Sequence, residues 1–277
     1  MRRIVTSLLL AWTPFAAATT FTWTSEVDGT PDKGDGTRFE SSQMALTVPL
    51  ERYNRSKESL STDFHMDITK FSWVGTTAGR GDYFWISMPV HYRQKRDGGS
   101  ELHVRFEPGL MTDFDAVGTE NIGLNAEVSG RTWLGKAEFV QYGLLVDRAF
   151  GDLRPRPTLS YATRLTKSTE MLLGFPKSNL QTRWSENMST YARFYPAGGF
   201  WREEVDNLAV PAVSDVSYVN WHFGIGTEFR WRANVWVSGE IGQLRNRTIT
   251  ANDQTAVKMR ADPGENGYWQ LGGQLRF

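Results

Sequence analysis

Four histidines are the side chains in this sequence best suited to acid–base chemistry. His65, His91, His103 and His222 each stand in a segment where apolar and polar residues alternate, always on the polar side. A histidine beside a hydroxyl nucleophile would form the pair that many hydrolases use. The sequence has no nucleophile and base at a spacing that identifies such a pair, so we predict no catalytic residue.

One of these histidines lies between two acids, in a pattern that could hold a metal. Asp63, His65 and Asp67 share one side of an alternating segment. Along an extended strand these three side chains would spread over about 13 Å, too far to reach a single ion together. We therefore expect a solvated polar row there, with no metal and no cofactor.

The polar rows carry both charge signs at close spacing. His103, Arg105 and Glu107 alternate with apolar residues on one segment, and Glu228 and Arg230 do so on another. Interleaved acids and bases can cross-link a closed interior or line a narrow neutral channel. The residues predicted to line the interior are His65, His103, Arg105, Glu107, His222, Glu228, Arg230 and Glu240.

These side chains must be positioned by β-strands, because the alternation has a period of two. The clearest case is residues 221–231, WHFGIGTEFRW, with aromatic and apolar residues on one face and polar or small residues on the other. Such a strand is long enough for a tilted bilayer crossing, and it has a tryptophan at each end.

Similar segments recur along the chain, and no helical period of useful length appears. We predict an all-β fold, a transmembrane antiparallel β-barrel of about 12 strands with 10–14 possible, since bacterial single-chain barrels have even strand numbers. A secreted β-sandwich would explain the alternation but not the charged rows on most strands. The predicted strands are residues 41–53, 60–74, 82–93, 100–111, 121–130, 137–148, 157–165, 170–184, 188–196, 218–231, 234–246 and 268–277.

The composition agrees with a barrel that is polar inside and aromatic outside. Aromatic residues make up 13% of the chain, with 11 tryptophans, yet the mean hydropathy is −0.44. The absence of cysteine excludes disulfides, thiolate metal sites and cysteine nucleophiles. The formal net charge is zero, so no nucleic-acid partner is expected.

The N-terminus predicts export. Arg2 and Arg3 precede a short apolar run that ends at the small residues 16–18, the order of regions in a cleaved signal peptide. We expect residues 1–18 to be removed and residues 19–277 to form a single barrel domain. Residues 19–40, with the strand-like stretch 21–27, are either a periplasmic lead-in or the first strand.

The chain's last strand resembles the C-terminal recognition signal of outer-membrane proteins of Gram-negative bacteria, which the barrel-assembly machinery reads. Its apolar or small positions alternate with polar ones and end on an aromatic residue. The resemblance implies that this strand is a handle for assembly, with outer-membrane lipid as the surroundings. The matching residues are Trp269, Leu271, Gly273, Leu275 and Phe277.

A second resemblance covers most of the predicted mature chain. The patterns at residues 46–50, 86–90 and 172–176, which each place a proline inside a strand, are similar to those of an uncharacterised family of small bacterial outer-membrane barrels. That family supplies no active site. Since proline cannot donate to a β-ladder, we expect Pro49, Pro89 and Pro176 to mark bulges or strand ends.

Three functions remain open at this point. The first is a monomeric, porin-like narrow passive channel or transporter for small polar solutes. The second is a non-conducting structural or adhesion barrel that acts through long extracellular loops, predicted at 197–217 and 247–267, opposite a short periplasmic turn at 232–233. The third is a lipid-acting barrel enzyme that uses an interior or rim histidine.

Overall fold

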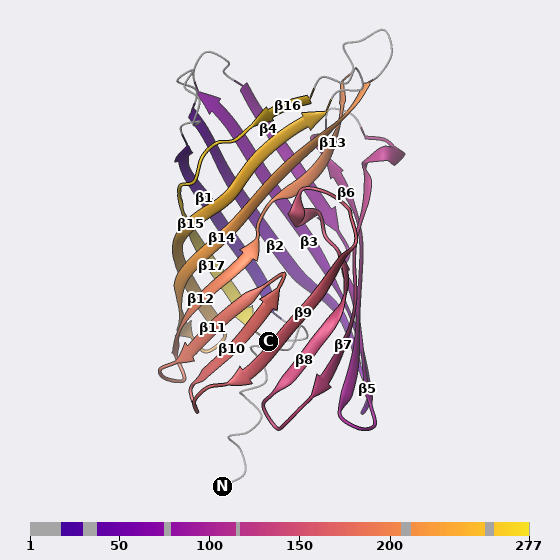
Figure 1. Ribbon diagram of the computed structural model, residues 1–277, viewed down its shortest axis with the longest axis vertical. Helices are drawn as coiled ribbons and strands as arrows, with labels where there is room; N and C mark the ends of the chain where they lie inside the picture. Colours follow the sequence, from indigo (N-terminus) through magenta and orange to yellow (C-terminus); the bar gives the residue numbers. More distant parts are fainter. Residues whose placement is uncertain are drawn as a thin grey trace.

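The computed structural model describes residues 18–29, 38–74, 79–114, 117–205, 212–252 and 258–276. They form one antiparallel sheet that closes on itself into a tall barrel (Figure 1). Among these residues, no helix has the length and apolar character needed to cross a membrane. Most of the predicted signal peptide and the terminal Phe277 lie outside the described residues.

The strands follow one another around the wall in chain order. They are β1 (Ala18–Gly29), β2 (Arg38–Asn54), β3 (Glu58–Val74), β4 (Gly79–Ser87), β5 (Val90–Arg96), β6 (Ser100–Thr112), β7 (Ile122–Trp133), β8 (Phe139–Val146), β9 (Arg156–Arg164), β10 (Thr169–Phe175), β11 (Ser178–Arg183), β12 (Met188–Pro196), β13 (Gly199–Val205), β14 (Ala212–Arg232), β15 (Val235–Asn252), β16 (Lys258–Ala261) and β17 (Gly267–Arg276). Two short 3-10 helices, η1 (Thr119–Asn121) and η2 (Arg148–Phe150), lie in the connections after β6 and β8.

Three pairs of these segments are single wall strands with a break. β4 and β5 both pair with β3 and β6, β12 and β13 both pair with β14, and β16 and β17 both pair with β15. The barrel therefore has 14 strand positions. It closes through β1 and β17, which pair from Ala18↔Arg276 to Glu26↔Tyr268.

The predicted fold class is confirmed, and the strand number lies at the upper end of the predicted range. Two features account for the difference from twelve. Residues 18–29 form β1, a full member of the wall, and the predicted strand 170–184 is two strands joined by a tight turn at Pro176 and Lys177. The turn was not predicted because the apolar pattern continues through it.

The three strand prolines stand where the ladder is interrupted, as predicted. The pairing of β2 with β3 shifts register between Pro49 and Glu51. Pro89 separates β4 from β5, and Pro176 lies in the turn between β10 and β11. A closed sheet has no free edge on which a proline could sit without cost, so these residues fall at bulges and strand ends.

The barrel changes polarity halfway along its long strands. On the lower part of β14, Phe223 and Ile225 point outward and are exposed, while higher on the same strand Val216 and Tyr218 point inward and are buried. On β15, Ile241 is outward and 70% exposed, whereas Ile249 is inward and 5% exposed. The outward apolar band marks the part that faces lipid, and the polar exterior above it faces water.

The upper part has a hydrophobic core of its own. We call it the outer lobe, built from the upper residues of β2–β4, β6 and β13–β15. Phe71 lies at its centre, with ring centroids 5.1 Å from Tyr218 and 5.7 Å from Trp201. The buried core residues are Phe39, Phe71, Tyr83, Trp85, Met111, Trp201, Val216, Tyr218 and Ile249.

The outer lobe corrects the prediction of long loops at 197–217 and 247–267. The first range contains β13 and the start of β14, and the second contains the end of β15 and β16. These strands reverse the membrane pattern, with apolar side chains inward and polar side chains outward. A search for lipid-facing apolar rows does not detect them.

One sector of the wall is much lower than the rest. β9, β10 and β11 have 9, 7 and 6 residues, whereas β14 and β15 have 21 and 18. Figure 1 shows the β10–β11 hairpin ending about halfway up the barrel. Above it, β13 pairs with β14 on one side only, as far as the described residues show.

The other edge of β13 is covered by the two 3-10 segments. The Asn121 side chain donates to the Arg202 carbonyl over 3.0 Å, and the Gly198 amide donates to the Ala149 carbonyl over 3.0 Å. An uncovered edge would leave backbone groups unpaired. The η1 and η2 segments therefore replace the strand that the low wall lacks.

The position of the membrane can be tested on a single strand. Ile241→Arg should lower the free energy of unfolding by about 2–4 kcal/mol, because the charge would enter hydrocarbon. Thr248→Arg, outward on the same strand above the change in polarity and beside Asp262, should be close to neutral. Denaturant unfolding in lipid vesicles measures both, and equal losses would contradict the assigned band.

Candidate functional site in the barrel interior

The eight polar residues predicted to line the interior lie on the strands as follows. Glu107, His222 and Glu240 are buried, although their chain neighbours Phe106, Phe223 and Ile241 are exposed on the outer surface. The remaining five are half-buried: His65, His103, Arg105, Glu228 and Arg230. Arg230 lies at the periplasmic end, where its side chain donates to the Ala233 carbonyl.

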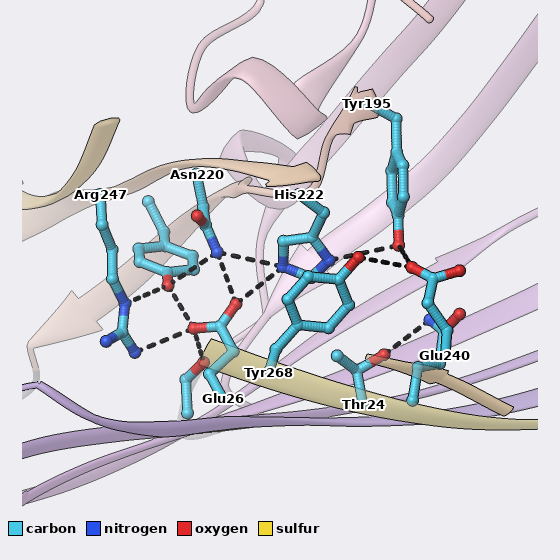
Figure 2. A network of polar contacts seen from close by, with 11 residues as sticks. Thr24, Glu26, Tyr195, Asn220, His222, Glu240, Arg247 and Tyr268 are labelled. Carbon is cyan, nitrogen blue, oxygen red and sulfur yellow. Dashed lines mark hydrogen bonds and ion pairs between the residues drawn. The ribbon is translucent and has the colours of Figure 1, made fainter. Parts of the chain in front are cut away.

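Glu26 of β1 is the centre of a buried polar network that the sequence did not reveal (Figure 2). Its carboxylate is 2.9 Å from the Arg247 guanidinium and also accepts hydrogen bonds from Ser41, Tyr218 and Asn220. Four strands, β1, β2, β14 and β15, meet through these contacts. The only sequence signal was the alternation at 21–27, which left open whether these residues were a strand or a lead-in.

His222 joins this group to a second carboxylate. Its Nε2 lies 3.2 Å from Glu26, its Nδ1 lies 3.2 Å from the Tyr195 hydroxyl, and its ring stacks on Tyr268 at 3.9 Å. Tyr195 and Tyr268 both donate to Glu240, which also pairs with Arg193. Figure 2 shows the resulting chain of contacts, which runs from Arg247 to Glu240.

Gly224 lies where this series of polar contacts passes β14. A Cβ atom at Gly224 would lie 2.2 Å from the Tyr268 hydroxyl and 2.4 Å from a Glu240 carboxylate oxygen. One or both of these buried side chains would have to move to make room for it. The small residue on the polar side of the 221–231 alternation therefore leaves space for the buried tyrosine–glutamate contact.

Three further acids of the interior also have basic partners. Glu101 is 2.6 Å from Arg93 and 3.2 Å from His103. Glu107 accepts hydrogen bonds from Trp85, Ser87 and Arg105. Glu228 is 2.6 Å from Arg276. The mixed signs noted in the sequence are thus arranged as neutralised pairs between neighbouring or facing strands.

Arg148 enters the interior from a connection and not from a strand. It is 5% exposed, forms an ion pair with Asp67 of β3, and lies between two indole rings, 5.1 Å from Trp85 and 5.2 Å from Trp201. Its amide also donates to the Asn125 side chain over 2.9 Å. The η2 segment, which lies between β8 and β9, therefore places a cation inside the barrel against residues of β3, β4 and β13.

The remaining histidines and acids have separate partners. Asp63 lies 3.3 Å from His91, His65 lies 2.9 Å from Thr47, and Asp67 binds Arg148. Among the described residues, no three acidic or histidine side chains gather as a metal site would require. Within the described part of the chain, no carboxylate is hydrogen-bonded to the His65 imidazole, so its contact with the threonine hydroxyl does not identify an enzyme.

Four of the five predicted assembly residues lie on the outer side of β17, and the fifth, Phe277, lies outside the described residues. Leu271 is 51% exposed, Leu275 is 38% exposed, and the Trp269 ring contacts Trp23 edge-on at 4.8 Å. Gly273 lies on the same side of the strand. Binding of this strand by the assembly machinery, and the monomeric state, remain predictions from the sequence.

The solved structures to which the chain is similar are outer-membrane barrels. An outer membrane channel from Pseudomonas putida F1 has 13% identity and a TM-score of 0.48 over 96% of this chain and 97% of that chain. The KdgM porin has 8% identity and a TM-score of 0.37 over 93% and 99%. The translocator domain of the autotransporter NalP from Neisseria meningitidis has 11% identity and a TM-score of 0.39 over 97% and 91%.

These likenesses carry nothing about function. No protein-family model matches the sequence, and no curated protein matches it. The closed sheet and its outward apolar band define the protein as a bacterial outer-membrane β-barrel. What the barrel does must be argued from its interior.

The Glu26–Arg247 pair can be tested by a double-mutant cycle. Arg247→Met should destabilise the barrel by about 3–5 kcal/mol, because it leaves a buried carboxylate without its cation. Glu26→Gln together with Arg247→Met should recover much of that loss. Denaturant unfolding in one detergent is measured for the wild type, the two single variants and the double variant. Additive losses would show that the two groups do not interact.

Proposed function

We propose that the protein is a narrow passive channel for small polar solutes, held closed by the η2 segment in the conformation described here. The observation that carries this proposal is Arg148. A connecting segment of the chain brings this buried cation into the interior and holds it against Asp67, Trp85 and Trp201. Segments folded into a barrel narrow its lumen, and their removal widens it.

The polar interior at membrane level supports a channel. A buried ion pair contributes little net stability compared with apolar side chains of the same volume. The interior nevertheless carries buried carboxylates at Glu26, Glu107 and Glu240. Neutralised rows of both signs suit small polar solutes better than strongly charged ones.

The hold on η2 is of a kind that can be released. Arg148 makes one ion pair and two cation–π contacts, and its Nη1 atom is buried without a hydrogen-bond partner among the described residues. The segment is also held by the backbone contact from Gly198 to Ala149 and by the buried Phe150 ring, which lies 5.6 Å from Phe175 and 5.8 Å from Trp221. Loss of the Arg148 side chain would empty the space between the two indole rings.

A non-conducting structural barrel is the second candidate, and the outer lobe favours it. The aromatic core around Phe71 lies at the extracellular end of the interior. Several charged groups below it are almost fully buried, including Glu26 at 6% and Arg247 at 3% exposure. A barrel that stays in this conformation would pass little.

Conductance in a planar bilayer tests the proposal. The wild type should show small or rare openings, and Arg148→Ala should raise the conductance or the open fraction clearly, because the η2 segment loses its anchor. Arg154→Ala is the matched control, since it removes the same charge from the same connection at a side chain that is 84% exposed.

Two outcomes would contradict the proposal. If the wild type and both variants are silent while folded, the barrel is non-conducting and the second candidate holds. If the wild type conducts and Arg148→Ala leaves the conductance unchanged, η2 does not close the path.

A further inference from the structure

The top of the low wall carries a group of three cations. We call Arg154, Arg156 and Lys177 the cationic rim. Arg154 and Arg156 lie where the η2 connection enters β9, and Lys177 lies in the turn between β10 and β11. The Arg154 side chain is 84% exposed, and Lys177 is exposed as well.

Aromatic contacts place these cations along one edge. The Arg156 guanidinium lies 4.3 Å over the ring of Phe150. That ring lies 5.6 Å from Phe175, which comes two residues before Lys177. The rim is therefore one continuous feature above the β9–β11 sector.

The cationic rim differs from the rest of the outer surface in its charge balance. Lys70 is 3.3 Å from Asp82, and Arg202 is 3.1 Å from Asp215. Arg245 likewise forms an ion pair with Glu265. Each of these cations on the taller walls thus has its own acid.

Within the rim, one acid serves two arginines. Asp152 lies 2.8 Å from Arg156 and 3.9 Å from Arg154, and Lys177 has no acidic partner among the described residues. Burial opposes ionisation of Asp152, but hydrogen bonds from Arg156 and from the Arg154 amide hold its pKa below the usual value. The carboxylate stays charged, and the rim keeps a surplus of two positive charges.

Directly below the rim, the outer surface is apolar. Leu159 of β9 is 63% exposed, Leu173 of β10 is 60% exposed, and Phe175 is 39% exposed. These side chains point away from the interior into the lipid-facing band. The sector therefore presents exposed cations above an exposed hydrocarbon surface.

The short strands set this surface at the membrane boundary. A strand of 7 to 9 residues tilted by about 45° rises only roughly 15–20 Å, less than the apolar band of about 25 Å that membrane barrels present. The cationic rim thus lies at the level of lipid headgroups, or slightly below it. Positive charges at that depth need anionic partners, and among the described residues only Asp152 provides one.

We propose that the low wall binds a phosphorylated lipid of the outer leaflet. Its phosphate groups lie against Arg154 and Lys177, with Arg156 behind them, and its acyl chains lie along Leu159 and Leu173. Arginine and lysine both recognise phosphate, and the surplus charge supplies the attraction. The proposal does not depend on whether the interior conducts.

Native mass spectrometry of the detergent-purified protein tests this site, with bisphosphorylated lipid A as the probe. The double variant Arg154→Gln, Lys177→Gln should bind the probe about 30-fold more weakly, the factor expected for two lost charge contacts near a membrane surface. The matched control is Lys136→Gln, Lys167→Gln, which removes two exposed charges from the β7–β8 and β9–β10 turns at the opposite end of the barrel and should bind like the wild type. Heat-modifiable migration on a gel shows that each variant is folded.

Three results would overturn the proposal. Equal weakening in the control pair would show only a general effect of charge. Equal binding of the dephosphorylated lipid would remove the role of phosphate. Displacement of the lipid by millimolar inorganic phosphate would indicate a site for a free anion.

Discussion

The structure depends on one constraint, which is that hydrocarbon offers no partner to a backbone amide or carbonyl. A sheet in a membrane must therefore close on itself, and here it closes through β1 and β17. That closure places Glu26 opposite Tyr268 in the ladder and brings it within reach of β14 and β15. The buried network of the interior follows from the closing of the barrel.

The same constraint explains how the low wall can exist. Only the lipid-facing part of the barrel requires a complete ring of strands. Above that level the chain can leave a strand position empty, provided that something covers the exposed edge. The edge of β13 is covered by Asn121 and Ala149, and the η2 segment that does so also sends Arg148 into the interior. Part of the cover over this edge, the candidate closure of the lumen and the two arginines of the cationic rim thus lie in one connection, between β8 and β9.

The change of polarity along the strands divides the molecule into a part that faces lipid and a part that faces water. Below it, Ile225 and Ile241 face lipid while Glu240 and His222 face inward; above it, Phe71 and Trp201 form a core and Lys70 and Arg245 face water. The chain makes both halves from the same strands. Below the boundary a strand has its apolar side chains outward, and above the boundary the same strand has them inward.

The sequence alone determined the architecture, because a period of two is visible wherever one face meets lipid and the other meets polar groups. It predicted the barrel, the prolines at breaks and the outward row of β17, and it marked residues such as His222 and Glu240 as polar-side positions. It failed at the upper β14 and β15, where the pattern reverses, and at the β10–β11 turn, where the pattern is continuous.

Only the tertiary structure decided which polar groups meet. Glu26 and Arg247 are separated by more than two hundred positions in the chain, and the contact between Arg148 and Asp67 crosses the interior from a connecting segment. Alternation fixes the face on which a side chain stands but says nothing about the stagger of the strands or the path of a loop. The partners inside the barrel depend on the closure of the sheet, which no local pattern encodes.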